Sequence, residues 1–181
     1  MKKIFFVSIF ACLLFILWAC EKKIDYLSNG YDALKNWDLN SAENYFIIVL
    51  NNSKNQNELS EASEGLGWVN LLKENYSSAE NYFNNSLSYN SKNVDAYLGL
   101  MITSWENGRW ENLIFAGQDF ENLAPDSYKL QILPGIEITW LDCMELLAMG
   151  YFMENQIDLL NQLSENIPSD DFIRKLQEAV N

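Results

Sequence analysis

The sequence has 181 residues, of which 49% are hydrophobic and 20% are charged. This composition is typical of one globular domain and is too apolar for a disordered chain. Its 25 acidic residues against 12 basic ones give a net charge of −13, so nucleic acid and anionic membrane surfaces are not expected as partners. The chain has no histidine, which excludes the usual proton shuttle and the histidine-containing zinc and Ser-His-Asp sites.

The N-terminus has the pattern of an export signal. Two lysines follow Met1, and the stretch from Ile4 to Trp18 is apolar apart from Ser8. This stretch is shorter than the roughly 20 apolar residues of a membrane-spanning helix, but it fits the apolar region of a signal peptide. An uncleaved N-terminal anchor is the alternative.

The segment Leu17-Trp18-Ala19-Cys20 resembles the lipobox of bacterial lipoproteins. The resemblance implies that residues 1–19 are a signal peptide, that Cys20 is acylated, and that residues 20–23 form a short tether. Several acyl chains, such as palmitate, would hold the protein on a membrane without a transmembrane helix. We therefore expect a lipid-anchored protein of the bacterial cell envelope, on the outer membrane and facing the periplasm or the cell surface.

A hexapeptide occurs twice in the body of the chain. Residues 41–46 read Ser-Ala-Glu-Asn-Tyr-Phe, and residues 78–83 repeat them 37 positions later. A weaker third unit follows at a spacing of 34. Repeats of this length predict a stacked solenoid of helical pairs.

These residues resemble the tetratricopeptide repeat. Matched to it, the units cover about 23–56, 60–93 and 94–127, followed by a degenerate unit at 141–168 and a capping helix at 169–181. The resemblance implies an all-α, right-handed α-solenoid of antiparallel helix pairs, forming one helical domain over residues 24–181. Residues 128–133 interrupt it with an extended segment. The helices are expected near 24–36, 41–53, 60–74, 77–89, 94–107 and 110–122.

Small residues recur where the two helices of a pair are expected to cross. Their lack of bulk lets the backbones approach closely, and an aromatic ring then fills the gap to the next pair. The residues predicted to serve this packing are Gly30, Ala42, Phe46, Gly67, Ala79 and Phe83.

In the tetratricopeptide repeat, the first helix of each pair lines a concave groove. Matched by position, the resemblance assigns to a protein-binding groove Tyr31, Leu34, Lys35, Glu64, Trp68, Leu72, Leu98, Ile102, Trp105 and Glu106. Aromatic residues in such a groove suit a peptide or a helix. An alternative is that Trp68 and Trp105 pack against neighbouring helices. The acidic residues Glu61, Glu64 and Asp95 would repel a carboxylate-bearing peptide.

The sequence carries no motif for a nucleotide, a cofactor, a metal or a catalytic nucleophile, so none of these is predicted. Cys143 has no expected disulfide partner and stands near Asp142 and Glu145, which disfavours a reactive thiolate. The expected function is a non-enzymatic, membrane-tethered scaffold that binds a protein or peptide partner, in an oligomeric state left open. The first alternative is a structural or self-associating lipoprotein, and a distant one is a hydrolase that uses carboxylates such as Asp142 and Glu145.

Overall fold

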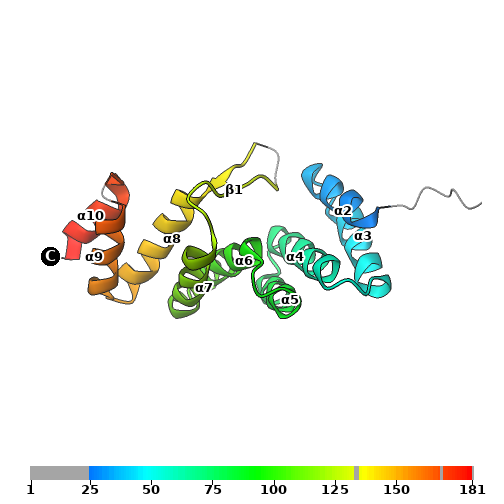
Figure 1. Ribbon diagram of the computed structural model, residues 1–181, viewed down its shortest axis with the longest axis horizontal. Coiled ribbons are helices and arrows are strands. Elements are labelled where there is room, and N and C mark those ends of the chain that lie inside the picture. The colour runs from blue at the N-terminus through cyan, green and yellow to red at the C-terminus, as the bar shows by residue number, and fades with distance from the viewer. Residues whose placement is uncertain (1–24, 133–134, 168, 181) are drawn as a thin grey trace, which may run out of the picture.

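The computed structural model describes residues 25–132, 135–167 and 169–180. In this part of the chain, helices follow one another along an arc, and a short hairpin stands on the inner side of that arc (Figure 1). The predicted signal peptide, Cys20 and the tether lie outside the described residues. None of the helices described is both long enough and apolar enough to cross a membrane.

Helix pairs make up most of the described chain. They are α2 (Tyr26–Lys35) with α3 (Leu39–Asn52), α4 (Gln56–Leu72) with α5 (Tyr76–Tyr89), α6 (Val94–Glu106) with α7 (Trp110–Leu123), and α8 (Trp140–Met153) with α9 (Ile157–Asn166). The last helix, α10 (Asp171–Val180), packs on α8 and α9 and buries Ile173. The predicted all-α solenoid with a C-terminal capping helix is confirmed.

Helix α4 begins at Gln56, earlier than the predicted residue 60. The Asn55 side chain accepts a hydrogen bond from the backbone N–H of Asn57 at 3.0 Å, which caps the first turn. The hydroxyl of Ser53 donates to Glu58 at 2.6 Å across the same turn. These polar contacts stabilise one additional turn that the apolar pattern of the helix does not show.

The same turn joins the two helices of every pair in the described chain. The residue two positions beyond the first helix has a positive φ in each case: Trp37 (60°), Glu74 (60°), Gly108 (62°) and Asn155 (54°). In the first pair, Trp37 N–H donates to the Leu34 carbonyl at 3.0 Å and Asp38 N–H donates to the Ala33 carbonyl at 2.9 Å. The other pairs repeat both bonds, which define the Schellman motif. The turn at Asn155 therefore shows that α8 and α9 are a pair of the same kind as the first three.

Phe46 lies between glycines of two successive helix pairs and is fully buried. A Cβ atom built on Gly30 of α2 would stand 2.6 Å from Cε1 of the Phe46 ring. A Cβ atom built on Gly65 of α4 would overlap the same ring. The ring thus occupies the volume that two missing side chains leave, and it joins the first pair to the second.

The arrangement recurs one unit later. Phe83 is fully buried between Gly67 of α4 and Gly99 of α6, and a Cβ atom built on Gly67 would stand 2.5 Å from its ring. Ala42 and Ala79, each the fourth residue of its helix (α3 and α5), are also fully buried. Each copy of the hexapeptide therefore places a small residue and a phenylalanine in the interior.

The glutamate of each hexapeptide copy makes an ion pair with the next unit. Lys73 Nζ lies 2.7 Å from Glu43, and Arg109 Nη2 lies 2.7 Å from Glu80. Both cations follow the first helix of the next pair. Because all four side chains are partly exposed, we expect each pair to add less than about 1 kcal/mol of stability.

A hairpin is inserted between α7 and α8. Its strands β1 (Lys129–Leu130) and β2 (Ile138–Thr139) pair antiparallel, with Leu130 opposite Ile138. The Tyr128 ring meets Phe120 of α7 edge-on at 5.0 Å, and its hydroxyl donates to Asp95 of α6 at 2.6 Å. The predicted extended segment is thus one arm of a hairpin that docks on α6 and α7.

Candidate functional site

The first helices of the pairs, α2, α4 and α6, line one face of the solenoid, which we call the inner face. The hairpin lies against it and meets α4 around a small apolar gap of about 30 Å³. Trp68 and Leu72 border this gap from α4, and the hairpin contributes Leu130, Ile132, Ile136 and Ile138. The hairpin therefore fills part of the face that the sequence analysis expected to be open.

A buried polar network lies next to this gap. Trp68 Nε1 donates to Oε1 of Glu64 at 2.9 Å, and Asn93 Nδ2 donates to Oε2 of Glu64 at 3.1 Å. The Asn93 amide also donates to Ser86 Oγ at 2.9 Å, and the buried hydroxyls of Ser86 and Ser60 are 2.9 Å apart. The network ties α4 to α5 and to the start of α6, where Asn93 caps the helix by accepting from Ala96 N–H at 3.2 Å.

Beside the network, the inner face opens into a cavity of about 450 Å³, which we call the acidic cavity. Its walls come from α2, α4, the α5–α6 loop, α6 and the hairpin. The lining residues are Tyr31, Glu61, Glu64, Asn90, Lys92, Asn93, Val94, Asp95 and Ile132. Three carboxyl groups from two helices thus surround one space that a ligand could enter.

Burial controls the protonation of this cavity. It raises the pKa of Glu64 to about 8, and the neighbouring Asp95 and Glu61 add to the rise while Asn93 and Trp68 oppose it. Burial also raises the pKa of Asp95, against the hydrogen bond from Tyr128, and raises the pKa of Glu61. The pKa of Tyr31 is raised by its burial and by the nearby carboxylates, so its hydroxyl stays protonated and donates to the Glu61 carbonyl at 3.0 Å.

Several residues that were predicted to line the groove are buried in the structure. Leu34 and Leu98 are 0% and 1% exposed, so they pack between helices and do not line the groove as predicted. Glu64 and Trp68 are 4% and 5% exposed. The Trp68 ring meets Phe83 edge-on at 5.1 Å, which is the packed arrangement that the sequence analysis kept as an alternative.

The remaining predicted groove residues keep some contact with solvent. Tyr31 and Leu72 are half-buried beside the cavity and the gap, and Ile102 is half-buried on α6. Trp105 is half-buried and meets Trp110 edge-on at 5.2 Å. Lys35 and Glu106 are exposed at the ends of α2 and α6. Of the predicted set, Tyr31 and Glu64 are therefore the two that border the acidic cavity.

Sequence reasoning missed Asn93 and Ile132 as parts of this site. Asn93 precedes a predicted helix, and its cap position was the available signal. Its side-chain contacts with Ser60 and Glu64 span about 30 residues, which no local pattern contains. Ile132 reaches the cavity because the hairpin folds back across α4 and α6.

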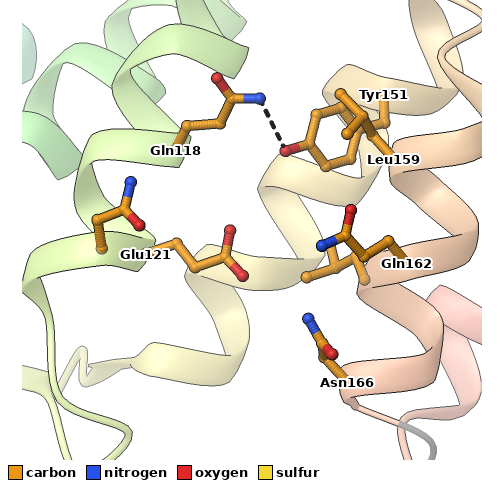
Figure 2. Close-up of a pocket in the computed structure, with 8 residues that line it drawn as sticks. Gln118, Glu121, Tyr151, Leu159, Gln162 and Asn166 are labelled. Carbon is orange, nitrogen blue, oxygen red and sulfur yellow. Dashed lines mark hydrogen bonds between the residues drawn. The ribbon is translucent and has the colours of Figure 1, made fainter.

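A second, polar cavity of about 210 Å³ lies between α7, α8 and α9. In Figure 2, Gln118 and Glu121 of α7 face Gln162 and Asn166 of α9 across this space, and Gln118 Nε2 donates to the Tyr151 hydroxyl at 3.2 Å. Burial raises the pKa of Glu121. Amide groups both donate and accept hydrogen bonds, so this cavity suits a neutral polar group.

Two of the residues considered for chemistry, Asp142 and Cys143, lie in settings that do not activate them. Asp142 forms a capping box with Thr139, accepting from its backbone N–H at 2.7 Å and from its hydroxyl at 2.6 Å. Cys143 is buried, and burial together with Asp142 and Asp95 raises its pKa to about 12. Within the described ranges, no group of three histidine, cysteine, aspartate or glutamate residues is placed to hold a metal ion.

Comparison with solved structures identifies the fold. The chain is similar to MamA, with a TM-score of 0.59 and 15% identity over 91% of this chain and 80% of that one. It is also similar to PilW, a type IV pilus biogenesis factor, with a TM-score of 0.62 and 13% identity over 83% of this chain and 65% of that one. No protein-family model and no curated protein sequence matches the chain. At these identities the likeness shows the fold alone: the chain is a tetratricopeptide-like solenoid.

Proposed function

We propose that this protein is a non-enzymatic scaffold, tethered to a membrane of the bacterial envelope, that holds a protein partner on the inner face of its solenoid. The acidic cavity is the observation that carries the proposal. It opens on the inner face, is built by three first helices and the hairpin, and has the size of ligand-binding pockets. The tetratricopeptide-like fold supports a role in protein interaction.

The proposed tether is the acylated Cys20 that follows the export signal. With residues 20–23 as the linker, the helical domain would stay close to the bilayer, and we place it on the outer membrane, facing the periplasm or the cell surface. Cys20→Ser in the full-length protein should release it from the membrane fraction. Continued attachment of the variant would instead support an uncleaved N-terminal anchor.

Site-specific crosslinking in the native envelope tests the scaffold function. A photoreactive amino acid at Lys92, an exposed residue beside the acidic cavity, should capture one defined partner protein. The same probe at Asn84, an exposed residue of α5, is the control and should not capture it. Equal capture from both positions, or none from Lys92, would contradict the proposal.

A structural or self-associating lipoprotein is the second candidate. It is favoured by the burial of Trp68 beneath the hairpin, which leaves less of the inner face open than the sequence suggests. The crosslinking experiment separates the two functions, since self-association predicts that the probe at Lys92 captures a second copy of this chain.

A further inference from the structure

The acidic cavity holds carboxyl groups that have no cationic partner in the part of the chain that the structure describes. None of the ion pairs formed by the described residues includes Glu61, Glu64 or Asp95. Glu64 is more than nine-tenths buried and lines the cavity, where burying an ionised carboxylate costs several kcal/mol unless it is paired. Lys92, at the edge of the cavity, is exposed and forms none of these ion pairs.

In the free protein, a proton takes the place of the missing cation. The pKa of Glu64, held at about 8 by burial and by Asp95, keeps most of this side chain neutral at pH 7. A positive group that enters the cavity would displace that proton and neutralise the carboxylate directly. The cavity is therefore complementary in charge to a cation.

The walls of the cavity select the kind of cation. Tyr31, Val94 and Ile132 provide apolar surface from three different elements beside the carboxyl groups. Lysine and arginine side chains combine an apolar stem with a charged end. The stem would contact the apolar surface, and the charged end would contact the carboxyl groups. A compact metal ion fits less well, because the described carboxyl groups do not converge as a set of metal ligands.

We propose that the acidic cavity binds a lysine or arginine side chain that the protein partner inserts between α2, α4 and α6. This inference rests on the proposed scaffold function and adds the chemistry that the partner presents.

Short peptides test the recognition directly. Full-length protein in detergent, labelled with ¹⁵N-tryptophan, is titrated with acetyl-Ala-Lys-Ala-amide, with the arginine peptide, and with the norleucine and glutamate peptides as controls. The Trp68 indole N–H reports binding because it donates to Glu64. We expect the lysine and arginine peptides to shift this resonance to saturation and to bind at least tenfold more tightly than the norleucine and glutamate peptides.

Variants locate the binding site. Glu61→Gln changes an exposed residue of the cavity and should weaken binding of the lysine peptide three- to tenfold. Lys92→Ser removes the positive charge at the edge and should strengthen it two- to fivefold, while Glu111→Gln on the exposed surface of α7 should leave it unchanged. Equal effects of Glu61→Gln and Glu111→Gln would overturn the assignment to this cavity.

Other outcomes are equally decisive. Equal affinity for the lysine and norleucine peptides would overturn recognition of charge. Binding of n-butylamine as tight as that of the lysine peptide would show a site for small amines and overturn recognition of a protein segment. If crosslinking at Lys92 captures a partner but the peptides do not discriminate by charge, the scaffold function stands and this inference fails; if neither succeeds, both fail.

Discussion

The indole of Trp68 donates a hydrogen bond to the carboxyl group of Glu64 at 2.9 Å, one helical turn away, and both side chains are buried. Asn93 donates to the other oxygen of the same carboxyl group. Each oxygen thus accepts one hydrogen bond from a neutral donor, and neither donor compensates a negative charge. The protonation state of Glu64 is therefore coupled to the folding of the solenoid.

This coupling predicts that stability falls as the pH rises. The pKa of Glu64 is about 8 in the folded protein, against an ordinary value of 4.5, so the native state binds more protons than the unfolded chain between these pH values. Its contribution to stability is complete below about pH 4.5 and is lost as the pH rises through 8. We expect the free energy of unfolding, measured in urea, to drop by a few kcal/mol from pH 5 to pH 8.5.

Glu64→Gln tests whether this residue causes the dependence. Because glutamine does not ionise, the variant should lose most of the drop between pH 5 and pH 8.5. Asp95, whose pKa burial also raises, accounts for a smaller remaining slope in the same direction. Glu111→Gln, at an exposed position of α7, should retain the slope of the wild type. Identical slopes for Glu64→Gln and the wild type would contradict the assignment.

Gly65→Ala should destabilise the protein although alanine favours helices. Its Cβ atom would overlap the Phe46 ring, and overpacking of this kind costs about 1–3 kcal/mol, against a gain in helix propensity of about 1 kcal/mol. Urea unfolding of the single variants and of Gly65→Ala with Phe46→Leu gives the coupling energy. We expect the double variant to recover part of the loss, because a smaller side chain makes room. Purely additive effects would show that the two residues do not compete for the same space.

Glu74→Gly should stabilise the protein. Glu74 has a φ of 60° in the turn after α4, where a residue with a Cβ atom is strained by roughly 1–2 kcal/mol and the equivalent position of the third pair holds Gly108. Part of this gain is offset by the greater entropy of glycine in the unfolded chain. We therefore expect the free energy of unfolding, measured by thermal unfolding, to increase by about 0.5–1 kcal/mol. Glu74→Ala removes the same carboxylate but keeps Cβ, so it should give no such increase. Gly108→Ala should reduce stability by a similar amount.

The sequence predicts the packing between pairs better than it predicts the site. The repeated hexapeptide predicted that Ala42 and Phe46 pack inside the first pair, because equivalent interior positions of a repeat must hold side chains of similar size. The contact between Gly65 and Phe46 was not predicted, because Gly65 belongs to the following unit and lies outside the repeated hexapeptide. A turn was expected both at Trp37 and at Gly108, because helix-stopping and N-capping residues surround both positions. Only Gly108 has the residue type that favours a positive φ, so the φ of 60° at Trp37 could not be read from the residue itself.

The sequence analysis overestimated how much of the inner face is open, and the reason is physical. A positional match to the tetratricopeptide repeat treats the inner face as free, whereas the hairpin of this chain covers Trp68 with Leu130 and Ile132. Whether a short extended segment folds back depends on contacts far along the chain, such as that between Tyr128 and Asp95, 33 residues apart. Such contacts leave no periodic pattern in the sequence, so the acidic cavity that they help to enclose could not be predicted from it.

Tyr128→Phe tests how firmly the hairpin is held. The tyrosine hydroxyl donates to Asp95 at 2.6 Å, and a hydrogen bond to a carboxylate contributes about 1.5–3 kcal/mol. The variant keeps the edge-on contact with Phe120, so the loss should come from the hydrogen bond alone. We expect lower stability in urea and faster hydrogen exchange at Trp140 N–H, which donates to the Tyr128 carbonyl at 3.1 Å.

Tyr97→Phe is the matched control for that change. Its hydroxyl donates to the neutral carbonyl of Ser91 at 3.3 Å, a longer bond in an exposed setting, so its removal should cost less than about 1 kcal/mol and leave exchange at Trp140 unchanged. Without Tyr128, the pKa of Asp95 should rise further, because the lost hydrogen bond lowers it in the wild type. The pH dependence of Tyr128→Phe should then be steeper than that of the wild type. A stability loss no larger than that of Tyr97→Phe would mean that apolar contacts at Leu130 and Ile132, and not the bond to Asp95, hold the hairpin on the inner face.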